Sequence, residues 1–381
     1  MFRSLIRSLR AWRRRSRKDH PLIIIEISKS ALLNNLHAIQ SLAPQWQVAP
    51  VLKSNAYGHG LALTAAILQH EGNLPFFCVD SYFEARMLRN AGILHPTLVL
   101  GFTPTNTITQ NKYRNISFTI ASLDQLKELS AKRVREHVHI KFDTGMHRQG
   151  VLLADIENAI EVISQCELFV EGVFSHLADA EIANSDITRV QIEKWNTVVK
   201  TFRQRCPQIR FYHLANSAGF GHASEIEANV GRIGIALYGI NPGNLQVQLL
   251  PALRMQSIVS GIRVINAGEI VGYNGIFTAQ GKTATATIPV GYYEGVDRML
   301  SNQGHFLING IETPLIGRVS MNMSSCDVTN VEGVCAGSSV TVISSRPEHP
   351  NSIENVARTC GTIPYEILVH IPTHLHRVVV L

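Results

Sequence analysis

The sequence has no hydrophobic run long enough to cross a membrane. Its apolar runs, such as residues 22–25, have the length of a β-strand, whereas a membrane-spanning helix needs roughly 18 to 20 apolar residues. The N-terminus also has no apolar segment of the kind found in a secretory signal. These absences predict a soluble protein without a transmembrane segment.

Paired cysteines are absent as well. Six cysteines are scattered along the chain, and no two of them form a C-x-x-C motif. This spacing argues against a disulfide framework and against a cysteine-rich metal site. We therefore expect a reducing, cytoplasmic setting and no bound metal.

Positive charge is concentrated at the N-terminus. The net charge is +6, but eight of the 35 basic residues lie before residue 20, together with only one of the 29 acidic residues. The rest of the chain is nearly neutral, which argues against nucleic-acid binding. Within residues 1–20, apolar residues recur at helical spacing among the arginines. This basic tail is either an amphipathic helix in weak contact with an anionic membrane surface or a disordered segment.

Short apolar runs alternate with helical patterns through the first two thirds of the chain. Eight such alternations are typical of a TIM-like (β/α)8 barrel, which we expect over residues 21–250. One helix is predicted over residues 31–42, with Ser30 as its N-cap. The apolar runs lie near residues 48–52, 76–80, 97–101, 117–121, 138–142, 169–175, 210–215 and 229–233.

Beyond residue 250 the pattern changes. Apolar and polar residues alternate over residues 256–262 and 283–288, which predicts strands, and helical patterns become rare. Residues 251–381 are therefore expected to form a second, mainly β domain after the α/β barrel.

Reactive residue types follow the predicted barrel strands, at the end where barrel enzymes place their active sites. Lys53 follows the first run, His176 the sixth and Ser217 the seventh, while Arg232 and Gly234 lie at the eighth. A partly desolvated lysine amine forms an imine with an aldehyde, and hydroxyl and glycine N–H groups bind phosphate. Lysine, phosphate donors and barrel together point to pyridoxal 5′-phosphate (PLP) as cofactor.

Six motifs carry a family resemblance. From about residue 24 to the C-terminus, the sequence resembles the alanine racemases, which are PLP-dependent enzymes with an N-terminal barrel and a C-terminal β domain. The motifs are KSNAYGHG (53–60), KFDTGMHR (141–148), ANS (215–217), RIGIALYG (232–239), GYYEG (291–295) and GRVSMN (317–322). The resemblance implies racemisation of L-alanine to D-alanine, supplying peptidoglycan synthesis, by a cytoplasmic homodimer with shared active sites.

The resemblance also implies roles for individual residues. Lys53 would bond to PLP and act as one catalytic base, and Tyr273 would be the second base, on the opposite face of the substrate. Arg232 would face the pyridine nitrogen, with His176 and His213 as orienting links to Tyr273 and Arg232. The other assignments are Tyr57, Ser217, Gly234 and Ile235 for the phosphate, and Arg148, Tyr292 and the backbone of Met321 for the substrate.

Several positions depart from the family pattern. Asn322 replaces an aspartate, Tyr293 and Glu294 replace a small residue and an aspartate, and Thr373 stands where many members have a tyrosine against the phosphate. A smaller residue at position 373 would enlarge the pocket, so a serine or broad-specificity racemase is the alternative to an alanine racemase. Lys141 matches a lysine that is carbamylated in some members, and the sequence leaves that modification open.

Three other classes share parts of the pattern. A non-catalytic PLP-carrier protein generally lacks a C-terminal β domain. A barrel-type PLP decarboxylase of basic amino acids typically has an acidic partner for the pyridine nitrogen, where this sequence has Arg232. A membrane or nucleic-acid adaptor would rest on the basic tail alone. An isomerase that acts on a small amino acid is therefore predicted.

Overall fold

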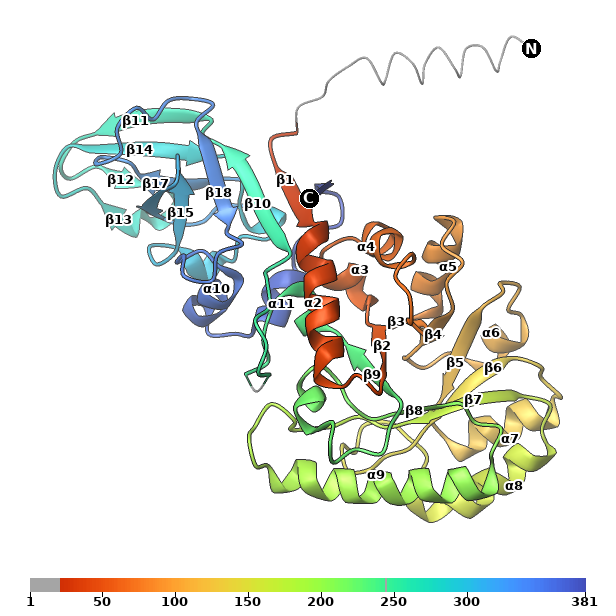
Figure 1. Cartoon of the computed structure of the whole chain (residues 1–381). Helices are drawn as coiled ribbons and strands as arrows, with labels where there is room; N and C mark the ends of the chain where they lie inside the picture. The colour runs from red at the N-terminus through yellow and green to blue at the C-terminus, as the bar shows by residue number, and fades with distance from the viewer. Residues whose placement is uncertain (1–20, 244) are drawn as a thin grey trace, which may run out of the picture. The chain divides into compact units, whose positions relative to one another are not determined.

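Figure 1 shows the computed structural model, which describes residues 21–243 and 245–381. The basic tail predicted over residues 1–20 lies outside this part of the chain. The chain divides into two compact units. The barrel unit comprises Glu26–Arg254, Ile343–Thr373 and Val379–Leu381, and the β unit comprises Met255–Val342, His374–Val378 and the described residues up to Ile25.

The barrel unit contains eight parallel strands, one at each predicted apolar run. They are β2 (Gln47–Pro50), β3 (Phe77–Val79), β4 (Thr97–Val99), β5 (Ile116–Ile120), β6 (His137–Lys141), β7 (Phe169–Phe174), β8 (Phe211–His213) and β9 (Val230–Ile233). β3 to β8 form one sheet, and β2 pairs with β9. A bridge between Val51 and Cys78 joins β2 to β3, and the Arg232 amide of β9 donates to the Ala215 carbonyl beyond β8 at 3.0 Å. The ring of strands closes, as the sequence predicted.

Helices follow the strands around the barrel (Figure 1). α2 (Lys29–Leu42) is capped by Ser28, whose hydroxyl accepts a hydrogen bond from the Ala31 amide at 3.1 Å. The prediction of Ser30 as the cap is wrong, because the helix begins before that residue. The other helices are α3 (Lys53–Tyr57), α4 (Leu61–Leu68), α5 (Tyr82–Asn90), α6 (Thr105–Thr109), α7 (Leu123–Ala131), α8 (Ile156–Gln165), α9 (Asp186–Arg205), α10 (Ile353–Cys360) and α11 (Pro364–Val369). Across the described ranges, no helix is long and apolar enough to span a membrane.

The helix α11 joins the barrel unit from a distant part of the sequence. Gly58, at the end of α3, lies so close to it that a Cβ atom would be 2.1 Å from the Leu368 carbonyl oxygen. Only glycine permits this approach. The neighbouring ring of Tyr57 lies 6.1 Å from that of Tyr365 in α11. The barrel unit is therefore not a single stretch that ends near residue 250, because α11 returns to the end of β2.

The β unit consists mainly of short antiparallel strands. Its segments are β10 (Leu253–Ile258), β11 (Gly261–Ile265), β12 (Ile270–Val271), β13 (Phe277–Thr278), β14 (Thr283–Ile288), β15 (His305–Ile308), β16 (Ile311–Pro314), β17 (Ser324–Asp327) and β18 (Ser339–Ile343), while β1 (Ile24–Ser28) and β19 (His376–Val380) lie near the chain ends. β14 pairs with β11 and β17, and β15 pairs with β16 and β18. The predicted strand 283–288 is β14. The predicted strand 256–262 is wrong in extent, because β10 ends at Ile258 and β11 begins at Gly261.

Candidate active site

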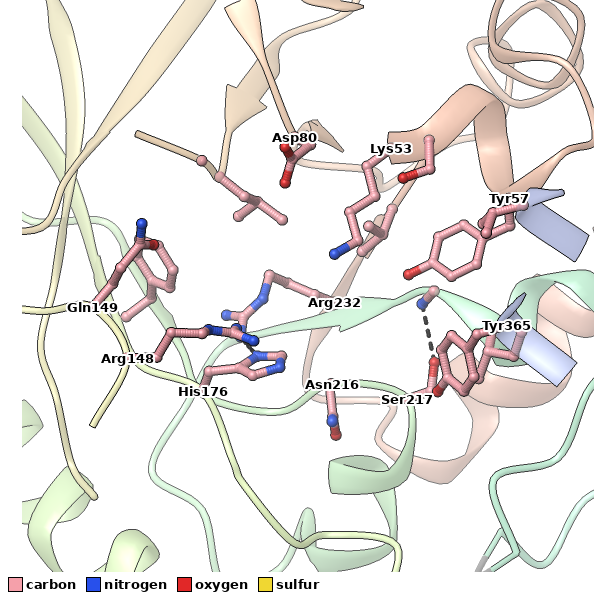
Figure 2. Close-up of a pocket in the computed structure, with 18 of the residues that line it drawn as sticks. Lys53, Tyr57, Asp80, Arg148, Gln149, His176, Asn216, Ser217, Arg232 and Tyr365 are labelled. Atoms are coloured by element: carbon pink, nitrogen blue, oxygen red, sulfur yellow. Dashed lines mark hydrogen bonds between the residues drawn. The ribbon is translucent and has the colours of Figure 1, made fainter. Parts of the chain in front are cut away.

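A cavity of about 780 Å³ lies where the barrel strands end at their carboxyl termini. Figure 2 shows that Lys53 and Tyr57, from the α3 segment after β2, and Arg232, from β9, point toward this cavity. Every residue that lines it belongs to the barrel unit. The predicted site residues among its lining are Lys53, Tyr57, Arg148, His176, Ser217, Arg232, Gly234 and Ile235. The structure therefore brings together residues that are far apart in the sequence.

The backbone after Lys53 is unusual. Ser54, Asn55 and Ala56 have φ values of 55°, 56° and 53°, in the left-handed region that L-residues rarely occupy. The Asn55 side-chain oxygen accepts a hydrogen bond from the Leu61 amide at 2.9 Å, and the backbone amide of Asn55 donates to the Glu84 carboxylate at 3.3 Å. Such strain is maintained only where surrounding contacts fix it, and it gathers at functional sites. These contacts hold the turn that presents Lys53 to the cavity.

Hydroxyl groups form one wall of the cavity. The Ser217 oxygen accepts hydrogen bonds from the amides of Gly234, at 3.0 Å, and Ala236, at 3.3 Å. Its own O–H can therefore donate to a ligand. Burial raises the pKa of the Tyr57 phenol above its ordinary value, so this group also remains a donor. A Cβ atom on Gly234 would lie 2.4 Å from the Tyr57 oxygen, so only glycine lets the Tyr57 hydroxyl approach this backbone.

Arg232 is buried behind the cavity and is held by two histidines. Its Nη1 lies 2.6 Å from Nδ1 of His213, and its Nη2 lies 3.3 Å from Nδ1 of His176. Burial lowers the pKa of the guanidinium to about 10, which still leaves it charged at neutral pH. Burial, followed by the Arg232 charge, lowers the pKa of both histidines well below the ordinary value. Both rings are therefore neutral and accept hydrogen bonds from the guanidinium.

Lys141 lies at the end of β6 and also lines the cavity. Its Nζ atom is 5.9 Å from the Phe174 ring centre. Burial lowers its pKa to about 8, and the charges of Arg148 and Arg232 act in the same direction. A substantial fraction of this amine is therefore neutral under mildly alkaline conditions.

We expect Lys141 to react with acetic anhydride along a titration curve centred near pH 8. Only the neutral amine is nucleophilic, and exposed lysines with an ordinary pKa of about 10.4 provide the internal reference. Mass spectrometry of labelled peptides across pH 6–11 measures the curve. Arg148→Gln should move the midpoint upward, because it removes a nearby positive charge. A Lys141 midpoint equal to that of the exposed lysines would contradict the prediction.

The loop that carries Arg148 is shaped by one carboxylate. Asp143 accepts hydrogen bonds through Oδ1 from the amides of Gly145, Met146 and His147, at 2.8, 3.0 and 3.1 Å. Three amide donors on one oxygen fix a tight turn directly after β6. This turn brings the chain from the strand end to Arg148 at the cavity wall.

The other predicted site residues lie in the β unit. Tyr273, Tyr292 and Met321 are exposed by 67%, 44% and 55%, and they are not among the residues that line the cavity. The amide of Tyr292 donates to the Ser320 carbonyl at 3.0 Å, and the amide of Tyr293 donates to the Met321 carbonyl at 2.9 Å. These bonds join the two motifs GYYEG and GRVSMN within the β unit.

Two departures from the family pattern contact each other. The Asn322 side-chain amide donates to the Glu294 carboxylate at 2.6 Å, and the other Glu294 oxygen accepts from the Gly291 amide at 2.9 Å. Glu294 is buried, so its charge depends on these two donors. The asparagine at position 322 is thus matched to the glutamate at position 294.

Asn322→Asp should lower the free energy of unfolding by about 1–3 kcal/mol at pH 7, because a donor to a buried carboxylate becomes a second carboxylate. Urea unfolding at pH 7 measures the change in the free energy of unfolding. Adding Glu294→Gln should restore stability, and Asn309→Asp at an exposed turn is the control. Equal stability of Asn322→Asp and the unmodified protein at pH 7 would refute the argument.

The sequence did not reveal every residue of the cavity. Tyr365 and Glu366 of α11 line it, whereas Thr373, which was expected at the phosphate, is not among its lining residues. Tyr365 lies beside Tyr57 and donates a long hydrogen bond to Glu181 at 3.4 Å. No local motif marks α11 as part of a site, because only the close packing on Gly58 brings it there.

Two family models match the chain in sequence order. The alanine racemase N-terminal domain covers residues 27–242, and the alanine racemase C-terminal domain covers residues 252–379. The chain belongs to the alanine racemase family. It is similar to alanine racemase 1 of Caldanaerobacter subterraneus, with 32% identity over 364 residues, which are 93% of this chain and 94% of that protein.

Solved alanine racemases have the same fold as this chain. The Bacillus anthracis alanine racemase with bound L-Ala-P has a TM-score of 0.85 at 29% identity, covering 95% of this chain and 96% of that one. The Bartonella henselae alanine racemase with covalently bound pyridoxal phosphate has a TM-score of 0.82 at 26% identity, covering 95% and 100%. The predicted family, fold class and PLP cofactor are confirmed, and this alanine racemase is a PLP-dependent isomerase. The match to the C-terminal domain decides against a PLP-carrier protein.

Proposed function

We propose that this enzyme racemises alanine with two bases, Lys53 and Tyr273, on opposite faces of the substrate α-carbon. Inversion requires a proton to leave from one face and another to arrive at the other, so two positioned groups are needed. The observation that carries the proposal is the position of Lys53 in a cavity whose walls also hold Arg232 and the Tyr57 and Ser217 hydroxyls. Tyr273 is included because the family resemblance implies that it is the second base.

The residues around the cavity fit PLP. Tyr57 and Ser217, with the backbone at Gly234 and Ile235, would hold its phosphate, and Lys53 would bond to it. The close approach of the Tyr57 hydroxyl to the Gly234 backbone, which a Cβ atom would block, supports this placement. When bound, PLP withdraws electrons from the substrate α-carbon and makes its proton removable.

Arg232 would donate to the pyridine nitrogen of the cofactor. Its five hydrogen bonds to described residues all use Nη1 and Nη2, so Nε–H is not engaged by that part of the chain. A guanidinium has only donors and retains its protons at neutral pH. Arg232 would therefore donate a hydrogen bond to the ring nitrogen without giving up its proton, which would limit electron withdrawal by the cofactor and disfavour side reactions.

Arg148 would bind the substrate carboxylate. A guanidinium binds a carboxylate through two parallel hydrogen bonds, which orients the amino acid as well as attracting it. Tyr292 and the backbone at Met321 would complete the substrate site from the β unit.

We infer a homodimer in which each active site uses two chains. Tyr273, Tyr292 and Met321 are exposed in the β unit and are absent from the lining of the cavity in the barrel unit. In a two-fold dimer, the β unit of one chain would supply these residues to the barrel unit of its partner. Each chain would then both give and receive a catalytic group.

We further infer a cytoplasmic enzyme that supplies D-alanine for peptidoglycan. Cys78, Cys206 and Cys326 are buried free thiols, which agrees with a reducing compartment.

The substrate range is tested by assaying L-alanine and L-serine in parallel. We expect alanine to be preferred, with measurable serine turnover because position 373 is a threonine. Thr373→Tyr should lower kcat/KM for serine relative to alanine by about tenfold, the effect of crowding out one small group. Thr197→Tyr, on the exposed side of α9, is the matched control. Absence of serine turnover at saturating substrate would contradict an enlarged pocket at position 373. Absence of alanine turnover would overturn the proposed mechanism.

A further inference from the structure

His139 is a fully buried histidine inside the barrel that has no role in the mechanism above. It lies on β6, and its Nδ1 atom is 2.9 Å from Nε2 of His213 on β8. His213 in turn contacts Arg232 through its other ring nitrogen, at 2.6 Å. Three buried side chains from three strands thus form one line that leads away from the cavity.

The chemistry of Arg232 sets the direction of every hydrogen bond in this line. A guanidinium can only donate, so Nδ1 of His213 must accept. A neutral imidazole carries one proton, which must then be on Nε2 of His213. That N–H donates to Nδ1 of His139, so the His139 proton must be on its own Nε2. The line therefore runs in one direction, from Arg232 through His213 to His139.

The backbone is built to place the His139 ring in this line. The register between β6 and β7 shifts between Val138 and His139, a bulge of the kind that redirects a side chain. His139 pairs with Gly172, and a Cβ atom on that glycine would lie 2.4 Å from Nδ1 of His139. Any other residue at position 172 would meet the ring at the atom that accepts from His213.

Aromatic side chains enclose both histidines. Phe211 is stacked on His139 at 5.7 Å, and Phe76 meets the edge of the same ring at 5.2 Å. Phe174 is stacked on His213 at 4.7 Å with an interplanar angle of 5°. These phenylalanine rings offer no polar group that could replace the hydrogen bonds of the two histidines. Their packing also holds both imidazoles in one orientation.

We propose that His139 is a positioning residue for Arg232: by accepting from His213, it fixes the tautomer and ring orientation with which His213 holds the guanidinium toward the cavity. The inference rests on the proposed function of Arg232. Without the His139 acceptor, the His213 Nε2–H would be buried without a partner. The His213 ring would then be more stable if it flipped or moved its proton to the other nitrogen. Either change disturbs the hydrogen bond to Arg232.

Histidine tautomers in the unaltered holoenzyme test the line directly. With ¹⁵N-histidine labelling, NMR should show His213 and His139 both protonated on Nε2 and not on Nδ1. His139→Leu should remove the His213 tautomer preference, and His139→Asn should keep it, because the asparagine oxygen replaces the Nδ1 acceptor. A proton on Nδ1 of either histidine in the unaltered protein would overturn the proposal, whatever the variants do.

Kinetics supply the second readout. His139→Leu should lower kcat for alanine by about tenfold, the effect of one unsatisfied buried donor, with KM changed less than twofold. His139→Asn should recover most of kcat, and His137→Leu, on the exposed end of the same strand, should leave kcat unchanged. Equal kcat for His139→Leu and the unaltered enzyme would refute the proposal. Borohydride reduction of the same samples shows whether PLP is bonded to Lys53. If the unaltered enzyme carries no such bond, the proposed function has failed, and not the proposal for His139.

Discussion

Lys53→Ala is expected to abolish both the covalent attachment of PLP and the racemisation of alanine. The side chain is proposed to serve as the attachment point and as one of the two bases, and loss of a residue with such a role typically lowers kcat by a factor on the order of 10⁴ or more. The purified unaltered enzyme should be yellow, and the variant should lose the absorption band of the attached cofactor. Borohydride reduction followed by peptide mapping identifies the lysine that carries PLP.

Lys141 is the informative competitor in that experiment. It lines the same cavity, and burial lowers its pKa to about 8, so its amine is partly neutral and able to react. Geometry favours Lys53, because its turn is held by Asn55 and Glu84 at the end of β2. Lys127→Ala, on the exposed side of α7, is the matched control. A reduced adduct on Lys141 in the unaltered enzyme would refute the assignment.

The barrel and much of its site could be predicted from the sequence because parallel strands are buried on both faces and read as short apolar runs. The carboxyl ends of these strands meet at one rim of a barrel. Residues placed directly after the runs, such as Lys53 and Ser217, therefore had to lie near one another. Five of the predicted lining residues follow from this rule, whereas Tyr57, Arg148 and Ile235 came from the family resemblance.

Contacts between distant segments could not be predicted in the same way. Tyr365 reaches the cavity because Gly58 lets α11 approach, and nothing in the local pattern of α11 indicates this. The sequence marked Glu294 and Asn322 as separate departures, and only the folded β unit shows that they form one hydrogen-bonded pair. His139 lies within the predicted apolar run 138–142, and the sequence does not indicate its contact with His213 because that residue lies on another strand.

The largest effect after loss of Lys53 is expected from the second base. Tyr273→Phe removes one hydroxyl from an exposed residue of the β unit and should leave folding unchanged. Racemisation should nevertheless fall by orders of magnitude, because one face of the substrate loses its proton-transfer group. Attachment of PLP to Lys53 should persist, which distinguishes this variant from Lys53→Ala.

Mixing the two inactive variants should restore activity if each site uses two chains. In a heterodimer, the chain with Tyr273→Phe still has Lys53, and its partner with Lys53→Ala still has Tyr273, so one of the two sites regains both bases. Random exchange of equal amounts makes about half of the dimers heterodimers, so about a quarter of the sites should recover. Lys53→Ala mixed with the double variant is the negative control, since no pairing there unites both bases. Heterodimers that are confirmed by native mass spectrometry and remain inactive would refute the shared site, because a site built within one chain cannot be rescued by exchange.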